Sequence, residues 1–398
     1  MTEKVRRQRR ALSIGCAAHI VQDGLTATIY VLLPVLAQTY GFSYAQVGLF
    51  KAVKSIAQGL PEMASGFLTE RIGEIRVLLF GLLLSAIGYV ALSIAPGAGA
   101  VLAALLLIGV GTALHHAPSS SLILTTYPED RRRGPLGIYN SSGDIGKLLF
   151  SGGFSLTVGV GMAWELISFS YGILAIFGAV FIALAARSLT AFRKSHAAAA
   201  HLPSNDLGWG ILSWRSFNSL LAVVFIDTLV QAGVLVFAAF LLLEKGLPLT
   251  VAMAGTVMLL LGGIFGKAGC GYLADRIGVR PAFVFIQILT GVGLVGLVLL
   301  PGWWSVALLV PLGVVVQGSS SITYGFAADL IHPKRMARGY ALLYSSSSFS
   351  AAGGPLMVGY FADGASIDIA FYVMAAAAIV AVPPIYMVSA ERSGAALA

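Results

Sequence analysis

Long apolar runs alternate with short polar segments along the whole chain. Each run has the roughly 20 residues that an α-helix needs to cross a bilayer. The runs fall at 11–39, 45–70, 76–95, 99–126, 135–160, 165–188, 216–243, 250–273, 281–300, 304–329, 338–362 and 368–389. The pattern therefore predicts an all-α integral membrane protein with twelve transmembrane helices.

One short charged turn occurs twice, each time between two apolar runs. Residues 66–76 read Gly-Phe-Leu-Thr-Glu-Arg-Ile-Gly-Glu-Ile-Arg, and residues 271–281 read Gly-Tyr-Leu-Ala-Asp-Arg-Ile-Gly-Val-Arg-Pro. An offset of 205 residues relates the copies and matches Gly66, Glu70, Arg71 and Gly73 to Gly271, Asp275, Arg276 and Gly278. A repeat at about half the chain length indicates a duplication.

The duplication predicts two pseudo-symmetric halves of six helices each. We place the N-terminal half at residues 1–188 and the C-terminal half at 216–398. The apolar pattern breaks between them, over 189–215, which we interpret as a cytoplasmic linker. An alanine run within it is compatible with a short surface helix.

Composition and charge support a membrane protein and its orientation. The chain is 58% hydrophobic and 11% charged, far below the roughly 25% charged residues of soluble domains. Of 25 Lys and Arg residues, 20 fall on the side of the predicted helices that holds both termini, and only Lys245 falls on the other. By the positive-inside rule both termini are cytoplasmic, in the cell inner membrane. The net charge of +8 thus reports topology and does not indicate a nucleic-acid partner.

The sequence carries no pattern typical of an enzyme. Its two cysteines, Cys16 and Cys270, form no disulfide framework or metal-ligand spacing. We find no nucleotide-binding loop, paired metal ligands or nucleophile–base spacing. We therefore expect neither an enzymatic activity nor a cofactor.

The first apolar run contains polar residues at helical spacing. His19, Asp23 and Thr26 fall at i, i+4 and i+7, on one face of a helix. An Asp at mid-membrane depth must face the bundle interior or a water-filled cavity, and it marks a functional site by default. The alternative is a neutral, hydrogen-bonded Asp that only holds two helices together.

The second run carries the densest polar stripe. Lys51, Lys54, Ser55, Gln58 and Glu62 follow at spacings of three and four. Such a stripe is either self-neutralising along one helix or the wall of a cavity whose cations hold an anionic ligand. Two lysines against one carboxylate favour the second interpretation.

Further ionisable groups occur in the fourth and fifth runs. Adjacent His115 and His116 would point about 100° apart in a regular helix, so we expect only one, His116, to face a cavity. Neither has an i, i+4 partner, and we predict no metal site. In the fifth run Asp144 and Lys147 are spaced for an i, i+3 ion pair, with Tyr139 upstream.

The C-terminal half is poorer in such groups. Asp227 lies at an offset of 204 from Asp23, and Gln231 follows it at i+4. Lys267 takes the position that repeats Glu62. We expect the N-terminal half to carry most of the charge-linked chemistry.

Twelve helices in two halves, with a Gly-x-x-x-Asp-Arg-x-Gly turn after the second and eighth, resemble the major facilitator superfamily over the whole chain. The 271–281 copy fits the motif fully and ends in Arg280, whereas the first copy has Glu70 for Asp and displaces the trailing Arg. The resemblance implies that both turns form a cytoplasmic gating lock. It also implies a central site exposed alternately to either side of the membrane.

A closer resemblance concerns the fosmidomycin resistance protein branch of drug exporters. It rests on the His19-Ile-Val-Gln-Asp23 segment, on His116-Ala-Pro118 with the following serines, and on Arg132-Arg-Gly134 with Gly143-Asp-Ile-Gly146. The sequence departs from the branch pattern where Ala117 intervenes and Asp144 replaces Asn. The resemblance implies drug export, and these departures leave the substrate and the direction of transport open.

We thus predict a secondary active transporter that works by alternating access, by proton-coupled export of a small organic anion such as a phosphonate or carboxylate. The alternatives are proton-coupled uptake of an organic anion and a non-transporting membrane sensor. We expect a monomer whose partners are its substrate, protons and the lipid bilayer, with the proton gradient as energy source.

Two sets of residues would carry this function. Protonation of a carboxylate would supply the coupling, because a low dielectric disfavours its charged form; the candidates are Asp23, Glu62, Asp144 and Asp227. The candidates for substrate binding are His19, Asp23, Lys51, Lys54, Gln58, His116, Tyr139, Lys147, Asp227, Gln231 and Lys267.

Overall fold

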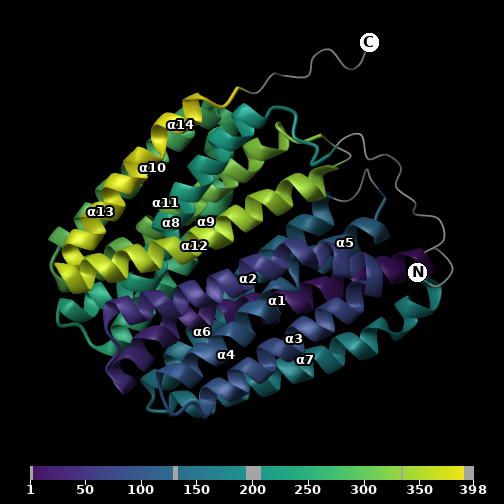
Figure 1. The fold of residues 1–398 in the computed structure, drawn as a ribbon, viewed down its shortest axis with the longest axis horizontal. Coiled ribbons are helices and arrows are strands. Elements are labelled where there is room, and N and C mark those ends of the chain that lie inside the picture. The colour runs from purple at the N-terminus through teal and green to yellow at the C-terminus, as the bar shows by residue number, and fades with distance from the viewer. Residues whose placement is uncertain (1–2, 129–132, 194–207, 333–334, 390–398) are drawn as a thin grey trace. The chain divides into compact units, whose positions relative to one another are not determined.

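Helices make up nearly all of the structure, a computed structural model that describes residues 3–128, 133–193, 208–332 and 335–389 (Figure 1). Within these residues the only β-structure is an isolated bridge between Ile211 and Ile331. Helices predominate because a backbone in lipid must satisfy its hydrogen bonds within its own segment.

The fourteen helical segments form twelve helices, as the sequence predicts. Segments α4 (Ala98–Ala113) and α5 (His116–Thr126) together make one span, and α13 (Ile367–Val380) and α14 (Val382–Tyr386) make another. Among the described residues, nine of the twelve are long and apolar enough to cross a membrane. The other three, α2, α6 and α12, carry the charged and serine-rich stretches, which lower their apolarity.

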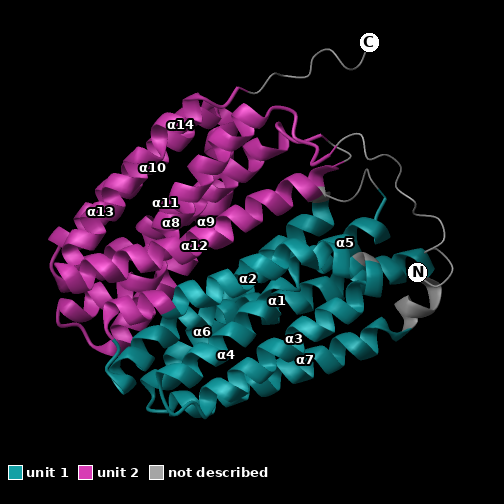
Figure 2. Ribbon diagram, viewed as in Figure 1, with its two compact units in different colours: residues 1–42, 50–203 teal, residues 43–49, 204–398 magenta. Residues whose placement is uncertain are grey.

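The chain divides into two compact units (Figure 2). Unit 1 comprises residues 1–42 and 50–203, and unit 2 comprises 43–49 and 204–398. The helices of unit 1 are, besides α4 and α5, α1 (Glu3–Tyr40), α2 (Tyr44–Ile72), α3 (Glu74–Ser93), α6 (Arg133–Gly159) and α7 (Trp164–Arg193). The first turn of α2 is thus grouped with unit 2.

In unit 1, helix α1 contacts α3, α4, α5, α6 and α7. Its apolar face packs with α3, α5 and α7 in a core that includes Ile14, Leu78, Leu82 and Ile182. The long contact with α6 depends on a glycine: a Cβ at Gly146 would lie 2.2 Å from the carbonyl oxygen of Ile20. Small residues allow this close approach of helices in membranes.

Unit 2 is arranged in the same way around α8 (Trp214–Glu244). This helix contacts α9 (Leu249–Ile277), α11 (Gly302–Ala328), α12 (Met336–Gly364), α13 and α14, and α10 (Val279–Leu299) packs on α11 and α13. Here too the pair α8–α12 approaches through a glycine, since a Cβ at Gly354 would lie 2.1 Å from the carbonyl oxygen of Leu229.

The two copies of the charged turn have the same backbone geometry. Gly73 joins α2 to α3 with φ 88° and ψ 151°, and Gly278 joins α9 to α10 with φ 93° and ψ 152°. This region of backbone space is essentially restricted to glycine. The last glycine of each motif is therefore required by the turn itself.

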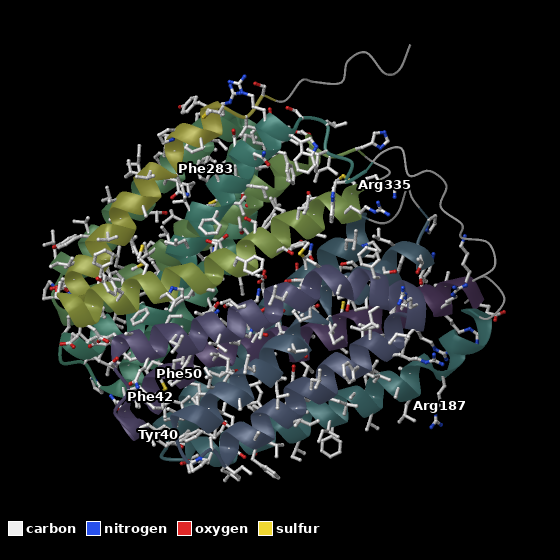
Figure 3. All side chains as sticks on the ribbon, in the orientation of Figure 1. Tyr40, Phe42, Phe50, Arg187, Phe283 and Arg335 are labelled. Carbon is white, nitrogen blue, oxygen red and sulfur yellow. The ribbon has the colours of Figure 1, made fainter. Side chains whose placement is uncertain are left out.

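An aromatic cluster marks one end of unit 1 (Figure 3). The ring of Phe42 lies 5.3 Å from that of Tyr40 and 4.7 Å from that of Phe50, measured between centroids. The Tyr40 hydroxyl donates a hydrogen bond to the carbonyl oxygen of Ala95 at 2.5 Å. Aromatic residues with a polar tip are typical of the membrane–water interface.

The structure departs from the predicted helices at three places. Helix α7 extends to Arg193, five residues into the predicted linker 189–215. Helix α1 begins at Glu3, eight residues before the predicted start at residue 11, and so includes the basic N-terminal segment. The fourth predicted helix is interrupted at Leu114 and His115, where α4 ends and α5 has not begun. The alanine run of the predicted linker lies outside the described residues.

Candidate functional site

The carboxylate of Asp23 is the centre of a charged cluster within unit 1. His19 Nε2 lies 3.2 Å from its Oδ2, His115 Nε2 lies 3.1 Å from its Oδ1, and Lys147 Nζ lies 3.1 Å from Oδ2. These groups come from α1, from the α4–α5 break and from α6. The Asp23 side chain is 7% exposed, so the cluster is inside the helix bundle, as expected of an intramembrane carboxylate.

Helix α6 reaches Asp23 because it has glycine where it crosses α1. A Cβ at Gly143 would lie 2.4 Å from His19 Nε2 and 2.9 Å from Asp23 Oδ2. Any side chain here would occupy the space of the imidazole and the carboxylate. One turn further on, the same face of α6 presents Lys147 to Asp23.

Both histidines of the adjacent pair lie beside Asp23, whereas the sequence places them about 100° apart and predicts that only His116 faces a cavity. His115 is the closer, and His116 Nε2 lies 4.0 Å from Asp23 Oδ1. The prediction assumed a regular helix, whereas His115 precedes α5 with φ −122° and ψ −37°. The break removes the 100° rotation that would separate the two side chains. His115 is buried, and His116, with 31% of its side chain exposed, lies at the rim.

Two backbone carbonyls orient the imidazoles. His19 Nδ1 lies 2.8 Å from the carbonyl oxygen of Tyr139, and His115 Nδ1 lies 2.6 Å from that of Thr112. A carbonyl oxygen only accepts hydrogen bonds, so each Nδ1 carries the proton and donates it. The Tyr139 ring stacks on His19 at 4.2 Å between centroids. Each Nε2 therefore faces the carboxylate.

Lys147 lies between two carboxylates. Its Nζ is 3.1 Å from Asp23 Oδ2 and 3.1 Å from Asp144 Oδ1, so the predicted i, i+3 pair forms. About a quarter of the Lys147 side chain, 28%, is exposed. Lys147, Asp144 and His116 thus form the accessible edge of a cluster whose other members are buried.

The polar stripe on α2 forms hydrogen bonds along its own helix. Lys51 Nζ donates to Ser55 Oγ and Lys54 Nζ donates to Gln58 Oε1, each at 2.7 Å. Lys51 also lies 5.3 Å from the centre of the Tyr30 ring. Both lysines are buried, and Glu62 one turn further on is half-buried. The stripe supplies two buried amino groups with neutral partners.

In unit 2 the corresponding carboxylate has a different environment. Asp227 Oδ1 accepts a hydrogen bond from Gln287 Nε2 at 2.6 Å, and Oδ2 accepts one from Ser319 Oγ at 2.8 Å. The following polar residue, Gln231, donates to the carbonyl oxygen of Val316 at 3.0 Å. Lys267 is half-buried on α9. The neutral donors thus link α8 to α10 and α11.

Sequence reasoning missed His115 as a partner of Asp23, and it missed Ser319 and Gln287 as partners of Asp227. The internal repeat relates Ser319 to His115, so it could have indicated one of these contacts from the other. Ser319 follows Asp227 by 92 residues, and His115 follows Asp23 by the same 92 residues. Gln287 had no signal, since an isolated Gln in an apolar helix is not distinctive.

The second charged turn carries two arginines in unit 2, of which Arg276 is exposed and Arg280 is half-buried. The Arg276 guanidinium lies 4.9 Å from the centre of the Tyr272 ring, and Arg280 Nη2 donates to the carbonyl oxygen of Val388 at 2.5 Å. Asp275 and Arg71 are exposed, and the Glu70 side chain lies outside the described residues.

Comparison with known proteins gives consistent matches along the chain. A profile of the Major Facilitator Superfamily matches residues 15–269 and 220–396. The fosmidomycin resistance protein of Escherichia coli is 23% identical over 387 residues, covering 94% of this chain and 91% of that protein. A probable 4-methylmuconolactone transporter of Cupriavidus pinatubonensis is 25% identical over 287 residues, covering 68% of this chain and 64% of that protein.

Solved structures show a similar fold. The crystal structure of a bacterial homolog of the human lysosomal transporter Spinster, inward-facing and unoccupied, matches with a TM-score of 0.72. The match has 16% sequence identity and covers 98% of this chain and 96% of that one. The occupied form of the homolog matches with a TM-score of 0.67.

Proposed function

The chain belongs to the Major Facilitator Superfamily, and we propose that it is a proton-coupled transporter that exports a small organic anion in exchange for protons. As a member of that family it is a multi-pass membrane transporter that works by alternating access, and not an enzyme. The proposal adds the coupling, the direction and the class of substrate. The observation that carries it is the Asp23 cluster.

The geometry around Asp23 supports proton coupling. In neutral His19 and His115 the proton is on Nδ1, which leaves a lone pair on Nε2 directed at a carboxylate oxygen. Two acceptors 3.1–3.2 Å apart repel each other unless a proton lies between them. One proton on Asp23 serves only one contact, so the second contact needs an imidazolium. The arrangement thus fits a cluster loaded with up to two transferable protons.

The same cluster supports an anionic substrate. Lys147 and His116 are its partly exposed members, and buried Lys51 and Lys54 add two amino groups on α2. A primary ammonium binds carboxylate, phosphonate or phosphate oxygens through charge-assisted hydrogen bonds. An anion bound at Lys147 would compete with Asp23 and Asp144 for the same Nζ.

The similarity to a fosmidomycin resistance protein over nearly the whole chain supports export, since resistance follows from lowering the internal concentration of a compound. Fosmidomycin is a phosphonate, so it is also a suitable probe for the cationic edge of the cluster.

One observation favours uptake as a second candidate. Lys147 pairs with Asp23 when that carboxylate is charged, and protonation of Asp23 would release Lys147 to bind an anion. Proton and anion would then bind together, as in a symporter. The pH dependence of the affinity for the anion distinguishes the two candidates. Lower pH weakens anion binding in the exporter and strengthens it in the uptake system.

The test uses purified protein in proteoliposomes with fosmidomycin outside and a pH-sensitive dye inside. We expect fosmidomycin to enter as protons leave, and Asp23→Asn and Lys147→Gln to abolish the dye signal. Lys245→Gln is the matched control, because Lys245 Nζ donates to the Val298 carbonyl at 2.7 Å, outside the cluster. Proton flux unchanged in both cluster variants would exclude this site, and protons moving with fosmidomycin would select uptake.

We further propose that both termini lie on the cytoplasmic side of the inner membrane, that residues 1–188 and 216–398 are the two moving halves, and that the protein works as a monomer. The exposed charges of the two repeated turns would then form the cytoplasmic lock. A cysteine introduced near either terminus should react with a membrane-impermeant maleimide only in inverted vesicles; labelling in intact cells would reverse the topology.

A further inference from the structure

Four side chains of the Asp23 cluster present metal-ligand atoms to one point. One ligand atom each from His19, Asp23, His115 and His116 lies within 4.8 Å of the other three. The distances from the imidazole Nε2 atoms to the nearest Asp23 oxygen are 3.2, 3.1 and 4.0 Å. In a tetrahedral zinc site with bonds of about 2.0–2.1 Å, ligand atoms lie about 3.3 Å apart. His19 and His115 are already at about this distance from Asp23, and His116 would have to move closer.

The partners of the imidazoles are those typical of metal ligands. A metal-bound histidine usually donates its other N–H to a carbonyl or carboxylate, which fixes the tautomer and the ring orientation. Here the Tyr139 and Thr112 carbonyls accept from Nδ1 of His19 and His115, so both Nε2 lone pairs point inward. Lys147 holds Asp23 Oδ2, which leaves Oδ1 beside His115 and His116.

Sequence spacing did not reveal this set. The prediction of no metal site rested on the lack of an i, i+4 partner for His115 or His116. In the structure the ligands come from α1 and from the α4–α5 break, 92 residues apart in sequence. The interruption of the helix places both adjacent histidines on the same carboxylate.

We propose that His19, Asp23, His115 and His116 form a binding site for one divalent transition-metal ion of the Zn²⁺ class. Three imidazoles and one carboxylate suit Zn²⁺, Co²⁺ or Ni²⁺, whereas Mg²⁺ and Ca²⁺ require oxygen ligands. Rim residue His116 is partly exposed and provides access. The inference does not depend on the cargo or the direction of transport.

The metal competes with the protons that bridge the same atoms. Ligation requires Nε2 and the carboxylate to be unprotonated, so metal binding weakens as pH falls. The other charged groups that act on the cluster are Lys147 and Asp144 on α6, and Lys54 on α2, which interacts electrostatically with Asp23. Asp144 offsets the charge of Lys147, which would otherwise oppose a cation.

The test is calorimetric titration of the full-length protein with ZnCl₂, purified without a polyhistidine tag. The background variant carries His196→Gln, His201→Gln and His332→Gln, so the cluster holds its only imidazoles. We expect one Zn²⁺ per chain at pH 7.5, at least tenfold weaker binding at pH 5.5, and no heat with MgCl₂. CoCl₂ should give visible d–d absorption bands typical of tetrahedral coordination.

Two variants assign the binding to the cluster. His115→Gln and the rim variant His116→Gln should each weaken Zn²⁺ binding by at least about tenfold, because even the loss of a residue that supports a metal ligand costs about 10- to 100-fold. Their metal-free unfolding midpoints show whether they are folded, and rim position 116 is expected to tolerate the change. No saturable Zn²⁺ binding to the background protein, or equal affinity in a folded His116→Gln variant, would overturn the proposal.

Discussion

Asp23 and Asp227 lie at almost the same position in the two repeats. Each carboxylate contacts a residue that lies the same number of positions downstream in the sequence. The residue 92 positions downstream is His115 for Asp23 and Ser319 for Asp227, and both contact the carboxylate. The other partners differ as well. Position 223, which repeats His19, is Val223, and position 351, which repeats Lys147, is Ala351.

The difference lies in whether the groups that contact the carboxylate can titrate. Both repeats use a carboxylate on their central helix to bind neighbouring helices. In unit 2 its partners are an amide and a hydroxyl, which do not titrate. In unit 1 they are imidazoles and an ammonium. The two repeats therefore share the position of one contact but not the chemistry of the groups that contact the carboxylate.

The largest expected effect comes from removing the two carboxylates. Asp23→Ala leaves the buried part of Lys147 without one of its counter-ions, and breaking a buried charge pair costs about 3–5 kcal/mol. Asp227→Ala leaves Gln287 and Ser319 without an acceptor, at a cost of about 1–3 kcal/mol. Unfolding by SDS in mixed micelles measures both. Equal costs would mean that charge does not distinguish the two sites.

A smaller effect, equal in both units, is expected at the helix crossings. Gly146→Ala and Gly354→Ala each place a methyl group against a backbone carbonyl and separate two helices, at a cost of about 1–3 kcal/mol for overpacking. The same unfolding assay applies, with Gly269→Ala as control, since a Cβ there would meet nothing within 4 Å. A large cost in only one unit would contradict a shared scaffold.

The charged turns should respond alike. Gly73→Ala and Gly278→Ala force a side chain into a region of positive φ that strains the backbone by about 1–3 kcal/mol. We expect the lower part of that range, because these turns lie at the ends of helices. Thermal unfolding in detergent is the measurement, and the turns would be judged inequivalent if only one substitution lowers the midpoint.

The smallest effect on stability is expected when unit 1 is made to resemble unit 2. His115→Ser copies Ser319, retains a hydrogen-bond donor toward Asp23, and should cost about 1 kcal/mol, a typical value for a point mutation. Transport should persist with a shallower dependence on pH, because one titrating group has been lost. The reciprocal Ser319→His variant is the control. An unchanged pH profile in His115→Ser would show that His115 does not exchange protons.

Several features of the molecule could be predicted from particular residues. The apolar runs predicted twelve helices, because spans in lipid are long and continuous. Gly73 and Gly278 predicted the repeated turn. The spacing of Asp144 to Lys147 predicted their ion pair, and the spacing of His19 to Asp23 predicted a shared helix face, on which the two are in contact. Each of these is local or periodic, so the sequence displays it directly.

Local spacing did not predict that His115 contacts Asp23. Its contact with Asp23 depends on the break between α4 and α5 and on the rotation of that span against α1. Likewise, Gln287 and Ser319 meet Asp227 only because α10 and α11 pack beside it. Hydropathy shows that a helix crosses the membrane. It does not show which face of that helix packs against its neighbours.

The sequence by itself determined the fold, the duplication and the asymmetry of charge between the repeats, because these depend on composition and on periodic positions. Only the tertiary structure decided that His19, His115, His116 and Lys147 meet on one carboxylate. The physical reason is that such a site is assembled from three helices, and the approach of those helices is governed by side-chain packing and by glycines such as Gly143, whose lack of a Cβ leaves room for the charged groups.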